Sequence, residues 1–269
     1  MRSHLLVPVD FSGPSKQMVA SLERFVTGQS QRVTLLHVWP PSMGIVESPE
    51  DKVRVRALLE EMADELSAQG WQVEPRMEEG RPGSTIIDVA DEVGAELIVL
   101  ANRGHSAITE VLLGSTAVDV LERSKLPVFL FCADASSQPL WDRIVHPTDL
   151  SKPADRALKW AQELAVEASL PLVLLHSVDD RFSGQTEVEK KRRQLEKLKG
   201  ELRSQGVGTV EVQVVEGPPK KMVVEAGDHY PGALFVMGTQ GRGWLGDLML
   251  GGVSRAMARQ GGHHLLLVP

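Results

Sequence analysis

The amino-acid sequence predicts an α/β protein made of two tandem domains, each a five-stranded, doubly wound parallel sheet with helices on both faces. Two observations carry this prediction. An ordered series of matching residues relates the two halves of the 269-residue chain, which indicates a duplicated domain rather than a solenoid of short repeats. Within each half, short apolar runs alternate with amphipathic segments of helical length, the pattern of a parallel sheet covered on both faces.

The repeat keeps its register along the whole chain. Residues 7–12 (VPVDFS) match residues 146–151 (HPTDLS) at an offset of 139. We therefore expect one domain at 1–133, a linker at 134–140 that contains the sequence SSQP, and a second domain at 141–269. Further matches follow in order, at offsets of 139 and then 137: residues 35–37 with 174–176, 79–80 with 216–217, 97–99 with 234–236, and Gly104 and Gly114 with Gly241 and Gly251.

The elements of the first half follow from local patterns. Residues 4–9 form a short apolar run that stops at Asp10, which is typical of a buried strand. Residues 49–69 form a long amphipathic segment that begins with acidic residues and stops at Gly70, which is typical of a helix. The second half repeats this order, with 186–205 as the counterpart of the long helix. The other expected strands of the first half are 32–39, 73–77, 97–101 and 128–131, and the other helices are 15–27, 84–93 and 114–124.

Composition and charge exclude several classes of protein. The formal net charge is −7, so the chain gains no general attraction to nucleic-acid phosphates, and no nucleic-acid partner is expected. Residues 1–140 carry 12 basic and 20 acidic residues, whereas the remainder carries 17 and 16, so the two surfaces are not equivalent. No apolar stretch approaches the ~20 residues of a membrane span. The single cysteine, Cys132, excludes an intrachain disulfide. These features predict a cytoplasmic protein.

Glycines with a regular spacing follow the fourth expected strand of each half. The second half carries Gly238 and Gly241, then Gly251 nine residues later. Such glycines let the backbone approach a polyphosphate and adopt positive φ, and the start of the helix that follows offers N–H groups and a favourable dipole to an anion. The candidate phosphate-binding residues are Gly238, Gly241, Gly251, Gly252, Val253 and Ser254 in the second half, and Gly104, Gly114 and Ser115 in the first, with Arg103 or Arg242 adding charge.

An aspartate ends the first expected strand of each half. Asp10 and Asp149 could accept hydrogen bonds from the ribose hydroxyls or the adenine amine of a nucleotide. They could equally cap the helix that follows, through N–H groups near Ser12 or Ser151. The glycine loops have a similar alternative, in which they are tight turns required only for packing. His37 and His176 end buried-looking strands, and no further metal ligands accompany them, so core or loop positions are expected.

This constellation resembles the universal stress protein family, in its A-like, tandem two-domain form. The nucleotide-binding members carry Gly-x2-Gly-x9-Gly-(Ser/Thr) after the fourth strand and an Asp at the end of the first. The resemblance covers essentially all of both halves, and it implies a Rossmann-like fold related to the adenine-nucleotide alpha hydrolases, with bound ATP or AMP in some members. It also implies that backbone groups at Val9 and Val38, or at Thr148 and Ser177, hold the base. Mg²⁺ would arrive with the nucleotide.

Each half departs from the family pattern at one position. Ala101 replaces the opening glycine of the first half, and would cost about 1–2 kcal/mol if that position requires positive φ. Gly252 replaces the usual Ser or Thr of the second half, which loses one hydroxyl hydrogen bond worth about 1–3 kcal/mol to a charged phosphate. We expect the second half to be the better nucleotide site, while binding in both halves, or in the first alone, stays open.

The functional prediction is a stress-responsive, adenine-nucleotide-dependent switch that acts through an unidentified protein partner. At most slow ATP hydrolysis is expected, because no catalytic base is evident beside the phosphate site. The alternative is a ligand-free tandem scaffold whose two sites have eroded, and a third possibility is an enzyme of a related nucleotide-binding family. Family members dimerise through the last strand, so residues 128–131 and 265–268 are expected to form an intrachain pseudo-dimer, or to support a homodimer.

Overall fold

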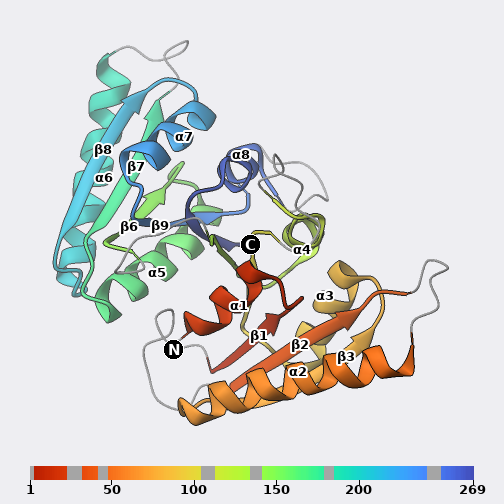
Figure 1. Cartoon of the computed structure of the whole chain (residues 1–269). Coiled ribbons are helices and arrows are strands. Elements are labelled where there is room, and N and C mark those ends of the chain that lie inside the picture. The colour runs from red at the N-terminus through yellow and green to blue at the C-terminus, as the bar shows by residue number, and fades with distance from the viewer. Residues whose placement is uncertain are drawn as a thin grey trace. The chain divides into compact units, whose positions relative to one another are not determined.

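The computed structural model describes residues 3–22, 32–41, 48–103, 113–133, 141–178, 185–240 and 250–269 (Figure 1). The chain divides into two compact units, Met1–Glu110 with Gly114–Phe129 and Val111–Leu113 with Leu130–Pro269. The expected linker, 134–140, lies outside the described residues. Each unit is an α/β fold with a parallel sheet, as the sequence predicts.

The first unit alternates strands and helices throughout. Its sheet has the order β3-β2-β1-β4-β5, and β1 pairs in parallel with both β2 and β4. The elements are β1 (His4–Pro8), α1 (Gly13–Ala20), β2 (Arg32–Trp39), α2 (Pro49–Ala68), β3 (Gln72–Glu79), α3 (Pro82–Val93), β4 (Leu97–Ala101), α4 (Ser115–Arg123) and β5 (Val128–Phe131).

The second unit repeats this architecture. Its strands have the order β10-β9-β6-β7-β8, with β6 parallel to β7 and β9. The elements are β6 (Arg143–Pro147), α5 (Lys152–Glu167), β7 (Leu172–Val178), α6 (Gln185–Ser204), β8 (Val210–Glu216), α7 (Pro219–His229), β9 (Ala233–Gly238), α8 (Gly252–Gln260) and β10 (His264–Val268).

Several elements of the first unit have other bounds than the sequence predicts: α1 ends at Ala20 rather than at residue 27, and α3 begins at Pro82 rather than at residue 84. The start of α1 and the length of β3 have a clear physical reason. Helix α1 begins at Gly13 rather than at residue 15, because the Ser12 hydroxyl accepts the N–H of Ser15 and thereby caps the helix earlier. Strand β3 is longer than expected, since all eight of its residues pair with β2. Its polar, largely exposed residues and Pro75 hide this length in the sequence, but they suit an edge strand.

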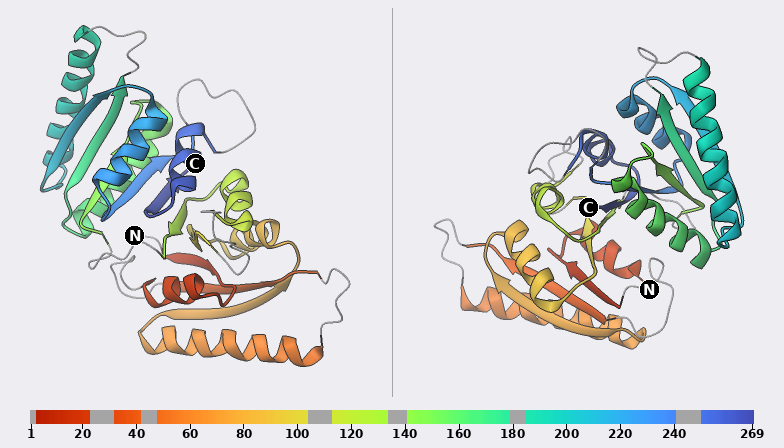
Figure 2. Two further views of the ribbon diagram at one scale, coloured as in Figure 1. Left: turned by 45° about the horizontal axis from the view of Figure 1, so that its top comes forward. Right: turned by 180° about the vertical axis from the view of Figure 1, so that it is seen from behind.

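Helices cover both faces of each sheet. The chain moves outward from β1 through β2 to β3 and then returns past β1 to β4. Right-handed crossovers therefore place α1 and α2 on one face and α3 and α4 on the other. The second unit follows the same path, with α7 packed beside α8. The long helices α2 and α6 each run along the edge strands of their own sheet (Figure 2).

The central strands are buried on both faces and form the core from aliphatic residues. Leu5, Leu6, Leu35 and Ile98 have no exposed surface in the first unit. The direction of winding reverses between β1 and β4, and between β6 and β9. A doubly wound sheet opens a crevice at the carboxyl ends of its strands at such a point.

Candidate functional site

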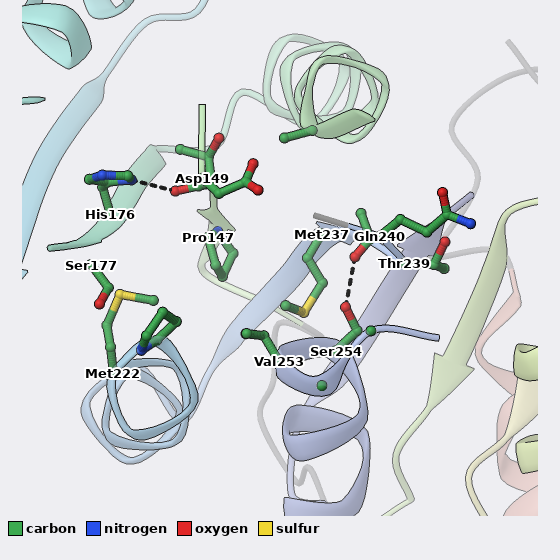
Figure 3. Close-up of a pocket in the computed structure, with 16 residues that line it drawn as sticks. Pro147, Asp149, His176, Ser177, Met222, Met237, Thr239, Gln240, Val253 and Ser254 are labelled. Carbon is green, nitrogen blue, oxygen red and sulfur yellow. Dashed lines mark hydrogen bonds between the residues drawn. The ribbon is translucent and has the colours of Figure 1, made fainter. Parts of the chain in front are cut away.

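A cavity of about 350 Å³ lies at the carboxyl edge of the second unit's sheet. In Figure 3, Asp149, Ser177 and Met222 lie around one side of it, and Val253 and Ser254 lie at the start of α8. Its wall therefore combines the ends of β6, β7 and β9 with the first turns of α7 and α8. The lining residues are Pro147, Thr148, Asp149, Ala154, His176, Ser177, Pro219, Met222, Met237, Gly238, Thr239, Gln240, Gly251, Gly252, Val253 and Ser254.

A cavity of about 390 Å³ occupies the equivalent place in the first unit. Its wall comes from the ends of β1, β2 and β4 and the first turns of α3 and α4. The lining residues are Pro8, Val9, Asp10, Ser15, Leu36, His37, Val38, Pro40, Pro82, Ile86, Leu100, Ala101, Arg103, Gly114, Ser115, Thr116 and Ala117.

The structure brings every described candidate residue to one of these two cavities. Gly104 and Gly241, together with Arg242, lie outside the described residues. The second cavity collects Thr148, Asp149, Ser177, Gly238, Gly251, Gly252, Val253 and Ser254, and the first collects Val9, Asp10, Val38, Gly114 and Ser115.

The two aspartates organise the turn that leads into the next helix. Asp149 Oδ1 accepts the N–H of Ser151 at 3.0 Å, and Asp10 Oδ1 accepts both the N–H and the hydroxyl of Ser12, at 3.0 and 2.6 Å. The structural role that the sequence allowed for these carboxylates is therefore present in both units. Because each carboxylate also lines its cavity, the structural role does not displace a binding role.

The residue after each aspartate has a left-handed backbone, although it is not glycine. Phe11 has φ of 60° and Leu150 has φ of 59°. Such a conformation costs a bulky residue roughly 1–2 kcal/mol and often marks a functional site. Its presence in both units shows that the turn is part of the fold of this site. No sequence signal revealed it, because glycine is the usual marker of such a turn.

The two histidines at the ends of β2 and β7 anchor the backbone beside the aspartates. His37 Nδ1 lies 2.8 Å from the Val9 carbonyl oxygen, and His176 Nδ1 lies 2.7 Å from that of Thr148 (Figure 3). A carbonyl can only accept, so Nδ1 of each ring donates. Burial lowers the pKa of His37, which favours the neutral ring. These histidines hold Val9 and Thr148 in place, a contact that the sequence did not reveal.

Gly251 permits a close approach between the loop after β9 and the start of α8. Its N–H donates to the Thr239 carbonyl at 2.6 Å, and a Cβ at this position would lie 2.9 Å from that oxygen. The Gly114 N–H makes the equivalent bond to Asn102 at 2.8 Å. Packing therefore requires glycine at residue 251 whether or not a ligand binds there, which agrees with the alternative that the glycines serve packing.

The opening position of the glycine loop does not behave as expected. Gly238 is the last residue of β9 and has no positive φ, and neither does Ala101 at the end of β4. The positive φ that the sequence allowed at Gly238 is not present, and the penalty that Ala101 would carry if its position required positive φ does not arise. Both residues end a strand with backbone angles open to an L-residue, although a Cβ added at Gly238 would lie 3.2 Å from the Gln240 carbonyl oxygen, which is a tight contact.

The first turns of α4 and α8 face the two cavities. Their N-caps, Gly114 and Gly251, have extended backbones and make no side-chain capping hydrogen bond. An uncapped helix start of this kind favours an anion. The Ser254 hydroxyl, however, donates to the Gly238 carbonyl at 2.7 Å (Figure 3). The expected donation from this hydroxyl to a phosphate is therefore already used within the protein.

Comparison with known proteins accounts for this arrangement. The model of the universal stress protein family matches residues 1–131 and matches again at residues 141–269. The chain belongs to the universal stress protein family.

Among its curated relatives, a universal stress protein of Mycolicibacterium smegmatis is 28% identical over 284 residues, which cover 95% of this chain and 93% of the relative. One from Bacillus subtilis is 29% identical over 146 residues, which cover 48% of this chain and 99% of the relative. The crystal structure of a universal stress protein from Archaeoglobus fulgidus DSM 4304 has a TM-score of 0.78 at 23% identity, and covers 100% of this chain and 98% of its own. This likeness supports the tandem fold of the family.

Two features are absent from the described residues of this universal stress protein: a group of metal ligands and a membrane-spanning helix. No group of three or more His, Cys, Asp or Glu side chains is arranged to hold a metal ion there. None of the described helices has the length and apolar character needed to cross a membrane.

Proposed function

We propose that this protein binds an adenine nucleotide, ATP or AMP, at the carboxyl edge of its sheets and acts as a cytoplasmic stress-response switch. The observation that carries the proposal is the pair of equivalent cavities. Each is lined by the aspartate, by residues that follow the fourth strand of the unit and by the uncapped start of a helix. The aspartate suits the ribose, and the loop residues and helix start suit the phosphates.

The phosphates would lie against the first turns of α4 and α8, where backbone N–H groups and the helix dipole favour negative charge. The ribose would lie near Asp10 or Asp149, whose Oδ1 atoms hold the turn. The base would pack against Val9 and Val38 in the first unit, which are 4% and 8% exposed. Any Mg²⁺ would arrive bound to the phosphates.

The switch would operate through the segment that joins Gly238 to Gly251 and its counterpart in the first unit. A nucleotide bound between these glycines contacts both ends of the segment, so its presence biases the surface offered to a protein partner. Such a role needs binding but no rapid turnover. An intrachain pseudo-dimer or a homodimer would present two of these segments.

The decisive experiment measures the nucleotide content of freshly purified full-length protein by mass spectrometry, followed by titration with ATP and AMP. We expect a stoichiometric adenine nucleotide, or saturable binding below millimolar concentration. No bound nucleotide and no binding at millimolar ATP would refute the proposal and favour a ligand-free scaffold. Phosphate release at a useful rate would instead identify an enzyme. A molar mass in solution near 29.4 kDa would exclude the homodimer.

A further inference from the structure

The two copies differ in a coordinated way beside the helix start that closes each cavity. Three equivalent positions at the starts of two helices carry different residues in the two units. The first unit has Gly83 at the start of α3 with Ser115 and Asp119 on α4, whereas the second unit has Lys220 at the start of α7 with Gly252 and Ala256 on α8.

In the first unit, a carboxylate occupies this space. A Cβ added at Gly83 would lie 2.0 Å from Asp119 Oδ2, so no side chain fits at residue 83 while Asp119 is present. Arg123 on the next turn lies 3.5 Å from the same carboxylate oxygen. The space beside the start of α4 therefore holds the ion pair of Asp119 and Arg123, and Ser115 adds a hydroxyl to the lining of the first cavity.

In the second unit, a lysine side chain takes the same space. A Cβ added at Gly252 would lie 2.8 Å from Lys220 Cε and 3.2 Å from Nζ. Gly252 lines the cavity, as does Pro219, which precedes the lysine. The small residue Ala256 replaces the aspartate and leaves room. The ammonium group therefore lies beside Gly252, the first residue of α8, which itself lines the cavity.

Lys220 adds a positive charge to a place where two helix starts already favour an anion. Lys220 lies in the first turn of α7 and beside the first turn of α8, and the positive ends of both helix dipoles repel a cation. Neither first turn contains an acidic residue. Within the described part of the chain, no carboxylate forms an ion pair with Lys220, whereas its neighbour Lys221 pairs with Glu225 at 3.5 Å.

Among the described residues, the second unit offers fewer side-chain donors to a phosphate than the first. Gly252 has no hydroxyl, and the Ser254 hydroxyl donates to Gly238. Gln240 stands where the first cavity has Arg103. Among the described residues near each cavity, the first unit has its cation in the loop after β4, whereas the second unit has Lys220 at the start of α7.

We propose that Lys220 is the phosphate-binding cation of the second unit and makes that site prefer ATP and ADP over AMP. The inference rests on the proposed nucleotide function. An ammonium acts on phosphate as a point charge, so its attraction grows with the number of phosphates. The first unit, with Asp119 in the same place, has no such preference from this position.

The test compares Lys220→Ala with Lys221→Ala in the full chain, since both remove one exposed lysine from the same helical turn. We expect Lys220→Ala to weaken ATP binding at one of the two sites about tenfold, as loss of a charge-assisted hydrogen bond does. AMP binding should change less than threefold, and the salt dependence of ATP binding should decrease. Lys220→Arg should retain most of the affinity, and Lys221→Ala should change none of these quantities.

A second measurement reports on the residue directly. The unmodified protein is acetylated with an amine-reactive ester in the presence of ATP or AMP, and each lysine is quantified by mass spectrometry. ATP should protect Lys220 but not Lys221, and AMP should protect neither. Equal labelling of both lysines under ATP, with unchanged affinity of Lys220→Ala, overturns this inference while leaving nucleotide binding intact. Absence of any nucleotide binding overturns the proposed function as well.

Discussion

Gly251→Ala should destabilise the second unit, whereas the adjacent Gly252→Ala should not. Both glycines lie at the start of α8 and both line the cavity, so the two substitutions add the same methyl group to the same turn. They differ in what the methyl group meets. At Gly251 it meets the carbonyl oxygen of Thr239 at 2.9 Å, and at Gly252 it meets the flexible end of Lys220.

The magnitude follows from how each neighbour can respond. The Thr239 carbonyl is backbone, and it already accepts the Gly251 N–H at 2.6 Å, so relief of the clash must shift the loop or lengthen that bond. Overpacking of this kind costs about 1–3 kcal/mol. The Lys220 side chain is exposed and can turn aside. Alanine in place of glycine in a helix gains up to about 1 kcal/mol, so Gly252→Ala should be neutral or slightly stabilising.

The assay is thermal and urea unfolding of the full chain by circular dichroism and calorimetry. Gly251→Ala should lower the midpoint of one transition by about 2–8 °C, and Gly252→Ala should leave it unchanged or raise it. An unchanged midpoint for Gly251→Ala would refute the reasoning that the nearby Thr239 carbonyl requires glycine at residue 251. An equal loss in both would show that the whole turn, rather than the Thr239 contact, resists a side chain.

Three further predictions concern pH, the aspartate turn and the space at Gly83. Burial lowers the pKa of His146 from 6.5 to about 4, so the unfolded chain takes up a proton at higher pH than the folded chain does. The free energy of unfolding should therefore fall by about 2–3 kcal/mol between pH 6.5 and 4.5. His146→Val, which introduces the residue found at the equivalent Val7, should remove this pH-dependent loss in urea unfolding. Asp149→Asn keeps an oxygen that accepts the Ser151 N–H and should unfold like the unmodified protein, whereas Asp149→Ala should lose about 1 kcal/mol, and both should weaken nucleotide binding in a titration. Gly83→Ala should destabilise the first unit by about 1–3 kcal/mol. Asp119→Ala in the same chain should restore only part of that loss in a double-mutant cycle, because the Cβ of residue 119 still lies 2.7 Å from the added methyl group.

Each of these has an outcome that would contradict it. The exposed His229→Asn variant is the control for pH, and an equal flattening of its stability profile would show that burial of His146 is not the cause. Equal stabilities of Asp149→Asn and Asp149→Ala would show that the hydrogen bond to the Ser151 N–H does not stabilise the protein. Additive effects of the Gly83 and Asp119 substitutions would show that the carboxylate does not exclude a side chain at residue 83.

Much of the fold was predictable because its strands and helices follow from local sequence patterns, and because both halves of the chain carry the same series of patterns. Strands β2, β4 and β5 begin and end where the apolar runs do, since a buried parallel strand needs a continuous apolar segment. The edge strand β3 was predicted too short, because its polar residues pair with β2 through the backbone and leave no hydrophobic pattern. The start of α1 depended on the Ser12 hydroxyl, and only the folded turn shows which residue that hydroxyl caps.

The candidate site divides in the same way. The sequence by itself determined the duplication, the doubly wound architecture and the residues that gather at the carboxyl edge, because the position of an aspartate or glycine after a strand is a matter of chain order. Only the tertiary structure decided what each group contacts there: that His37 holds the Val9 carbonyl, that Ser254 donates to Gly238, and that Lys220 reaches Gly252. These contacts join residues far apart in the chain. They depend on the direction of individual side chains, which no local pattern specifies.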